Sequence, residues 1–189
     1  PRRSGSSTSW RTSPSGVGAL PLPELAGRAD DAPHQAVAAS SDGIPRLEMD
    51  FFFLSTKQEK DSLTCLALAD CTSGGVAACG SPTKSGVQAP YLVEFVVYTV
   101  NVWGYQDIIL HTDGEEAIVN LVSEVAKKRS SKTIPEHGPK YSHQSQGTVE
   151  QSIKGVEGMT RTLLHAIADK VGVEFLSQDP IVAWAVRHA

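Results

Sequence analysis

The chain has 189 residues, of which 40% are hydrophobic and 20% are charged, so it holds enough apolar material for one domain with a core of ordinary size. Its formal net charge is −4, with 17 Lys and Arg against 21 Asp and Glu. A protein that binds nucleic acid by charge alone is usually basic, so this composition excludes that mode of binding. Any contact with DNA must use a local basic face or metal ions that offset acidic side chains.

The cysteines and the apolar runs exclude two further classes of protein. Cys65, Cys71 and Cys79 are odd in number and form no Cys-x-x-Cys pair, which argues against a disulfide framework and against a zinc ribbon. We expect them to be reduced core residues of an intracellular protein. No apolar run approaches the roughly 18 residues that a membrane span needs, so we expect no membrane partner.

The chain divides into two regions by composition. Residues 1–43 are rich in Ser, Gly, Pro, Ala and Arg and show no sustained periodicity, which predicts a disordered linker or tail. Residues 44–189 carry the periodic patterns and the whole net charge. The chain begins with Pro1 and ends inside the apolar run 181–186, so we expect a piece of a longer protein, truncated at its C-terminus.

Residues 44–189 alternate between strand and helix patterns. The turn signal Gly74-Gly75 joins two of the strands into an antiparallel hairpin. The near-continuous apolar run at 47–54 indicates a central strand that is covered on both faces. The order predicts an α/β fold with a five-stranded mixed sheet flanked by helices. The expected strands are 47–54, 62–70, 76–79, 107–111 and 132–136, and the expected helices are 92–103, 115–128 and a long one from 148.

Several side chains are expected to support this fold. Trp103 and Trp184 are predicted core residues, and Asp70 is predicted to serve a turn at the end of its strand. Glu115 and Glu116 fit the N-terminal end of a helix dipole, with a place near a metal ion as the alternative. The long helix is expected to bury one stripe, formed by Val149, Ile153, Val156, Thr160, Leu163 and Ile167.

Three acidic residues suggest chemistry. Asp50 lies inside the first apolar strand, Asp113 directly follows the fourth strand, and Glu150 opens the long helix. An unpaired carboxylate is costly to bury, and carboxylates that share a site repel each other unless a cation lies between them. Hard divalent cations such as Mg²⁺ prefer oxygen ligands. The three acids therefore predict a divalent metal site.

These acids and their surroundings resemble the Asp, Asp, Glu triad of retroviral and retrotransposon integrase cores, which belong to the ribonuclease H-like superfamily. The 36 residues between Asp113 and Glu150 compare with about 35 in that family. His111-Thr112-Asp113-Gly114 is similar to the family's Thr-Asp-Asn-Gly. Residues 144–150, Gln-Ser-Gln-Gly-Thr-Val-Glu, are similar to its Gln-x-Asn-Gly-x-x-Glu. The resemblance covers residues 44–189 and implies a ribonuclease H-like catalytic core there.

The resemblance implies a metal-dependent polynucleotidyl transferase from a retrotransposon polyprotein. Asp50 would bridge two Mg²⁺ or Mn²⁺ ions, and Asp113 and Glu150 would hold one ion each, so that DNA phosphodiester bonds are cut and joined. The implied partners are the element ends, the target DNA and further copies of the chain. The implied location is the nucleus or a cytoplasmic element particle.

Three further residues are candidates for binding nucleic acid. Lys154 lies one helical turn beyond Glu150, where the family has a DNA-contacting Lys, and a solvated charge is the alternative. Gln146 replaces the Asn of the family's loop motif. His143 replaces the usual Pro and is expected to contact DNA or metal, or else to be merely exposed.

Two alternatives to the integrase remain at the level of the sequence. One is another ribonuclease H-like nuclease or a transposase, although many transposases carry a large insertion between the last two acids. The other is a decayed, non-catalytic remnant, because Gly114 stands where the family has Asn, and Gln146 replaces a second Asn.

Overall fold

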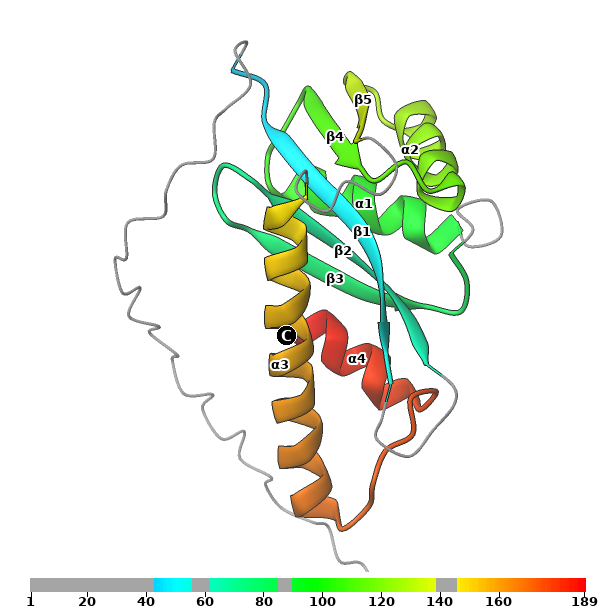
Figure 1. Ribbon diagram of the computed structural model, residues 1–189, viewed down its shortest axis with the longest axis vertical. Coiled ribbons are helices and arrows are strands. Elements are labelled where there is room, and N and C mark those ends of the chain that lie inside the picture. The colour runs from blue at the N-terminus through cyan, green and yellow to red at the C-terminus, as the bar shows by residue number, and fades with distance from the viewer. Residues whose placement is uncertain (1–42, 56–61, 85–89, 139–145) are drawn as a thin grey trace, which may run out of the picture. The chain divides into compact units, whose positions relative to one another are not determined.

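The computed structural model describes residues 43–55, 62–84, 90–138 and 146–189. Five strands form one mixed sheet in the order β3-β2-β1-β4-β5 (Figure 1). β1 pairs antiparallel with β2 and parallel with β4, β2 pairs antiparallel with β3, and β4 pairs parallel with β5. The predicted five-stranded mixed sheet with the first strand at its centre is confirmed. The strands are β1 (Arg46–Leu54), β2 (Leu63–Asp70), β3 (Val76–Ser81), β4 (Ile108–Thr112) and β5 (Thr133–His137).

Helices cover both faces of the sheet. α1 (Pro90–Val102) and α2 (Glu116–Lys128) pack on one face, and α3 (Gly147–Val171) and α4 (Pro180–His188) pack on the other. The predicted strands and the first three helices are confirmed, with ends that differ by one or two residues. The predicted tail lies outside the described residues except for Gly43, so its disorder stays a prediction.

The alternation of side chains along β1 separates two cores. Leu47, Met49 and Phe51 point into the cluster with α1 and α2, whereas Phe52 and Leu54 point into the cluster with α3 and α4. Successive side chains of a strand point to opposite faces, so the even-numbered residues of β1 all face α3 and α4. Glu48 and Asp50 belong to this even set. The two acids therefore lie on the same face as the long helix that carries Glu150.

Small residues on β2 and β3 bring α4 close to the sheet. The side chains of β2 that face α3 and α4 are Cys65, Ala67 and Ala69, which occupy little space. A Cβ atom at Gly80 would lie only 3.1 Å from the Cβ of Ala183, so α4 packs directly against the backbone of β3. The small residues thus leave the larger Phe52 and Leu54 of β1 to fill the space beneath the helices.

α4 and the end of α3 depart from the sequence-based expectation. α4 was not expected as a separate helix, and Trp184, predicted to be a core residue, is 47% exposed. The buried residues of α4 are Val182, Ala185 and Val186, which leaves Trp184 on the outer face, where it stacks on His188. On α3 the predicted stripe is buried at Val149, Val156 and Thr160. Its remaining members, Ile153, Leu163 and Ile167, are only partly buried.

Trp103, Asp70 and the three cysteines behave as expected. Trp103 packs against the core beside α1, and Cys65, Cys71 and Cys79 are buried and unpaired. The Asp70 carboxylate accepts hydrogen bonds from the Thr72 N–H at 2.9 Å, from the Ser73 hydroxyl, and from the Tyr105 hydroxyl at 2.6 Å. The turn between β2 and β3 is thereby joined to the segment that enters β4.

Among the described residues, no helix combines the length and the apolar character that crossing a membrane would require.

Candidate active site

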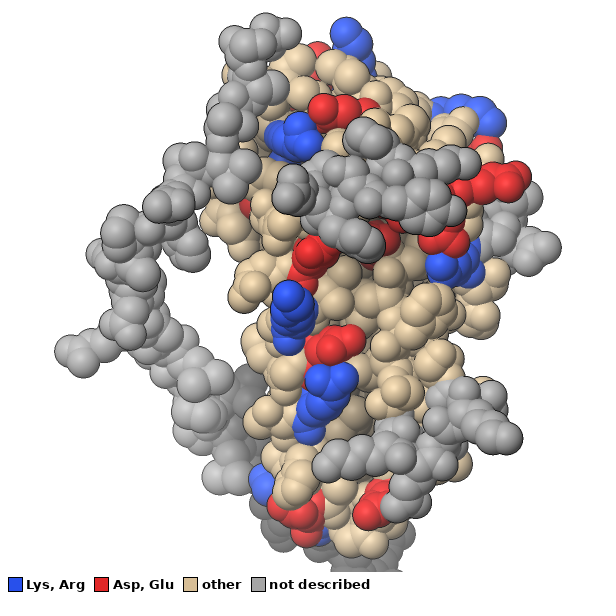
Figure 2. All heavy atoms as spheres, in the orientation of Figure 1, with Lys and Arg blue, Asp and Glu red and all other residues tan. Residues whose placement is uncertain are grey.

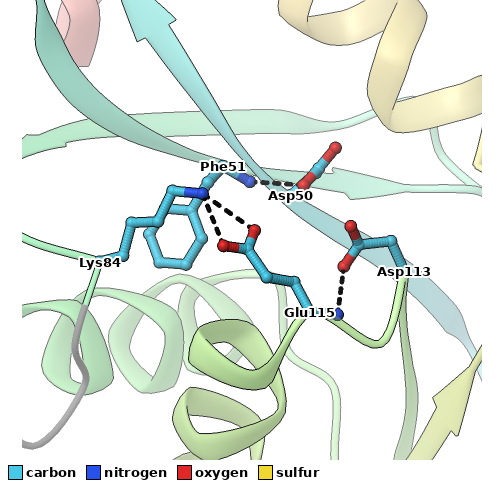
Figure 3. Close-up of polar contacts among 5 residues, drawn as sticks. All are labelled: Asp50, Phe51, Lys84, Asp113 and Glu115. Atoms are coloured by element: carbon cyan, nitrogen blue, oxygen red, sulfur yellow. Dashed lines mark hydrogen bonds and ion pairs between the residues drawn. The ribbon is translucent and has the colours of Figure 1, made fainter. Parts of the chain in front are cut away.

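Asp50 and Asp113 lie side by side because of the register between two parallel strands. Glu48 of β1 pairs with His111 of β4, and Asp50 and Asp113 each lie two residues further along the chain. Partners in a parallel ladder point to the same face, and the alternation repeats every two residues. β4 ends at Thr112, so Asp113 lies just past the ladder, beside the part of β1 that carries Asp50 (Figure 3).

The environment of Asp50 disfavours its charge. Burial, and to a smaller extent the neighbouring Asp113 carboxylate, raise the pKa of Asp50 from 3.8 to about 6, while a hydrogen bond from the Phe51 N–H at 2.7 Å works in the opposite direction. Two neighbouring carboxylates repel each other when both are charged, and this repulsion costs free energy. A cation bound between them would remove that cost.

A tight turn fixes the direction of Asp113. Its Oδ1 accepts a hydrogen bond from the Glu115 N–H at 2.9 Å, and the intervening Gly114 has a φ of +77°, a value that favours glycine. The Gly138 N–H donates to the Thr112 carbonyl at 2.8 Å, which ties the end of β5 to this turn. The turn leads directly into α2, so the helix and the sheet together hold the Asp113 carboxylate toward Asp50.

Lys84 and Glu115 are two further charged residues near Asp50 and Asp113. The Lys84 ammonium contacts both carboxylate oxygens of Glu115, at 2.8 and 2.9 Å. It also lies over the ring of Phe51 (Figure 3), 5.5 Å from its centroid, and over the ring of Phe53, 5.0 Å from its centroid. Glu115 was predicted to serve the helix dipole or to lie near a metal ion, whereas Lys84, a lone Lys in a loop, carries no recognisable sequence signal.

Glu48 holds the beginning of α3 against β1. The Glu48 side chain is almost completely buried, and its Oε2 accepts a hydrogen bond from the Val149 N–H at 3.0 Å. Val149 lies in the first turn of α3, where backbone N–H groups have no partner within the helix. Glu48 was not among the predicted site residues. The sequence does show it as a second acid in the apolar run 47–54, on the same face as Asp50.

His111 lies beside Glu48 in the register and is also buried. Neither of its ring nitrogens has a hydrogen-bond partner among the described residues, and the nearest carboxylate oxygen, on Glu136, is 3.6 Å from Nδ1. Burial lowers the pKa of His111, and the nearby Arg46 guanidinium lowers it further. The imidazole is therefore held neutral next to the acidic residues of the same face.

The remaining predicted site residues are placed as follows. Glu150 lies half-buried in the first turn of α3, and Lys154 is exposed one turn later. Gln146 is buried at the N-cap of α3, and its Nε2 has no partner among the described residues. His143 lies outside the described residues.

The structure brings two of the three predicted acids, Asp50 and Asp113, close together. Within the described part of the chain, no three His, Cys, Asp or Glu side chains lie close enough together to hold one metal ion. Asp50 and Asp113 form a pair, and Glu150 is not joined to it. The donor set of the pair fits a hard divalent cation, because it consists of carboxylate oxygens that repel each other. The roles of all three acids as metal ligands stay predictions.

The strand order and the helices on both faces define a class of fold, the ribonuclease H-like core of the integrases. The chain is similar to a chain in the cryo-EM structure of a simian T-cell lymphotropic virus intasome in complex with the PP2A regulatory subunit B56 gamma. The two are 18% identical with a TM-score of 0.54, over 76% of this chain and 48% of that one. The chain thus spans about half the length of that relative. The predicted integrase-core fold is confirmed.

A second solved structure is similar to the chain with a lower TM-score. It is the HTLV-2 integrase catalytic core domain in complex with magnesium, in a trimeric form, with 15% identity and a TM-score of 0.49 over 77% of this chain and 82% of that one. No protein-family model and no curated protein matches the sequence.

Proposed function

We propose that this chain is a metal-dependent polynucleotidyl transferase of the integrase type, which cuts and joins DNA phosphodiester bonds. The observation that carries the proposal is the closeness of Asp50, in the middle of β1, to Asp113, which directly follows the parallel strand β4. The raised pKa of Asp50 supports it, because a carboxylate that is costly to charge alone becomes a good ligand when a cation is present.

Each acid has a distinct part in the proposed mechanism. Asp50 would help to hold both of two divalent cations, Mg²⁺ or Mn²⁺, with Asp113 holding one of them and Glu150, in the first turn of α3, holding the other. The bound ions would activate the attacking oxygen and stabilise the leaving oxygen of an in-line displacement. Glu48 and the turn at Gly114 orient the acids, and Lys154, Gln146 and His143 are the proposed contacts with DNA.

The charge distribution supports dependence on a cation. On the face shown in Figure 2, Lys and Arg side chains form separate groups beside Asp and Glu and do not form one broad basic surface. The approach of DNA to Asp50 and Asp113 would therefore depend on metal ions and on a few Lys and Arg side chains. We place this activity inside the cell, in the nucleus or in an element particle, as part of a homo-oligomer.

Phosphodiester chemistry tests the proposal directly. The 189-residue chain is incubated with labelled duplex and branched oligonucleotides in Mg²⁺ or Mn²⁺, and cleavage or joining is followed on a denaturing gel. We expect products that disappear with a chelator and in Asp50→Asn and Asp113→Asn. Asp169→Asn is the matched control, since Asp169 is an exposed acid near the far end of α3.

A second candidate is a non-catalytic remnant that folds and still binds DNA. The position of Glu150 apart from the acidic pair favours it. The same experiment separates the two candidates, because a remnant yields no products with either metal ion while its fold and its binding of DNA persist.

A further inference from the structure

The loop after β3 presents Lys84 to the acidic edge in a defined position. The Ser81 hydroxyl donates a hydrogen bond to the Thr83 carbonyl at 2.8 Å, which closes a tight turn just past the end of β3. Lys84 follows this turn. Its ammonium lies against Glu115, next to the turn that carries Asp113 (Figure 3). Lys84 thus contacts Glu115 and lies close enough to Asp50 for its charge to lower the pKa of that carboxyl, although these residues come from different parts of the chain.

Two aromatic rings support the Lys84 side chain. The ammonium lies over Phe51 and Phe53, and Phe53 is 51% exposed, which is unusual for a large apolar residue on the central strand of a sheet. An aromatic face attracts a cation without neutralising it. The rings therefore keep the charge at the edge of β1 whether or not Glu115 is bound to it.

The positive charge of Lys84 offsets the repulsion that nearby acids would exert on a DNA phosphate. A DNA phosphate that approaches Asp50, Asp113 and Glu115 meets three acids, and the charge of Lys84 acts on the same group of side chains. The bond between Lys84 and Glu115 is a partly exposed ion pair, and such pairs are weak because water solvates both partners. Exchange of a carboxylate for a phosphate therefore costs little.

We propose that Lys84 exchanges Glu115 for a phosphate of the DNA strand at the acidic pair and thereby positions that strand, an inference that rests on the proposed function. Glu115 acts as the competitor that occupies Lys84 when no DNA is bound. A phosphate oxygen replaces the carboxylate oxygens, and no covalent bond changes. Lys84 is thus a positioning residue for the phosphate backbone and does not read the base sequence.

The dependence of DNA binding on salt concentration tests this proposal, because the slope of log K against log salt is proportional to the number of phosphates that the protein neutralises. Binding of a fluorescent DNA duplex to the whole chain is measured by anisotropy between low and moderate salt in Ca²⁺, which is chosen to allow binding without turnover. We expect Lys84→Ala to weaken binding several-fold and to reduce the slope of log K against log salt by about 0.9, the loss of one contact. Lys84→Arg should keep the slope. Glu115→Gln should tighten binding at low salt, because it frees Lys84.

Lys127→Ala is the matched control. Lys127 is also ion-paired to a Glu, at 2.7 Å, but it lies at the opposite end of α2 from Glu115. An unchanged slope in Lys84→Ala, or an equal loss in Lys127→Ala, overturns the role of Lys84. In either case, metal-dependent activity that Asp50→Asn abolishes would leave the proposed function standing. If the unsubstituted chain binds no DNA, both proposals are wrong.

Discussion

The Glu48 carboxylate accepts a hydrogen bond from the Val149 N–H at 3.0 Å and so joins the strand of Asp50 to the helix of Glu150. Glu48 and Asp50 are two residues apart on the same face of β1, and Val149 and Glu150 are neighbours in the first turn of α3. One buried hydrogen bond therefore sets the position of the third predicted acid relative to the first. It also satisfies an N–H group that the helix itself cannot satisfy.

Removal of this bond should destabilise the fold. We expect Glu48→Ala to lower the free energy of unfolding by about 1–3 kcal/mol, because the Val149 N–H in the first turn of α3 loses its acceptor. Glu48→Gln keeps an acceptor oxygen and should lose less. Urea denaturation followed by circular dichroism measures both values. Equal losses in the two variants would contradict this, because Gln keeps the shape and an acceptor oxygen, so the negative charge of Glu48 would then be what stabilises α3.

The sequence predicted the fold well because its signals are local. Alternation along 47–54 and the 3.6-residue period of the helices depend only on neighbouring residues, and the end of β4 brings Asp113 beside Asp50 once the two strands pair. The contacts of Glu48 and Lys84 join residues far apart in the chain, so no local pattern announces them. Helical periodicity also predicts which side Glu150 faces, but not how far the start of α3 lies from the end of β1.

α4 shows a second limit of the sequence. Six of its nine residues are Ile, Val, Ala or Trp, and hydrophobicity alone does not reveal which side of so short a helix faces the sheet. The absence of a side chain at Gly80 allows close contact at Ala183, and this contact turns Trp184 outward.

Trp184 is the basis of a prediction about self-association. We expect Trp184→Glu to shift the chain toward monomer, because a large exposed aromatic residue on α4 fits a contact between copies and a charge there would be desolvated on association. Sedimentation equilibrium over a range of concentrations measures the change. Met159→Glu, on an exposed position of α3, is the comparison. A larger effect of the Met159 change would place the contact on α3 instead.

The hydrogen bond between Tyr105 and Asp70 predicts a dependence of stability on pH. Burial alone would raise the pKa of Asp70, but hydrogen bonds from Ser73, Tyr105 and the backbone N–H of Thr72 outweigh it and hold the pKa below 3.8. A carboxyl group with a lowered pKa in the folded state stabilises the fold above its unfolded value, and this stability is lost as the pH falls through the folded value.

We therefore expect Tyr105→Phe to cost about 1–2 kcal/mol at neutral pH, and to cost less as the pH falls through the lowered pKa of Asp70 in the folded state. Thermal unfolding of both proteins across the acidic range tests this. A difference that stays constant with pH would show that the Tyr105 hydroxyl matters only through packing.

The last prediction concerns Asp50 with and without metal. Its pKa is raised from 3.8 to about 6 in the folded state, so the stability that its protonated form contributes is present below pH 3.8 and lost as the pH rises through 6. Without metal, Asp50→Asn should therefore be more stable than the unsubstituted chain at pH 7, by on the order of 1 kcal/mol because Asp50 is partly exposed. The advantage should vanish below about pH 4.

Addition of Mg²⁺ or Mn²⁺ should reverse this order. The folded state alone presents the paired carboxylates, so metal should raise the melting temperature of the unsubstituted chain by mass action, equivalent to about 2.7 kcal/mol at a hundred times the dissociation constant. Asp50→Asn should lose most of this response, and Asp169→Asn should keep it. A salt-bridged, structural Asp50 predicts the opposite sign without metal, so an Asn variant that is less stable at pH 7 and still responds to metal would remove Asp50 from the site.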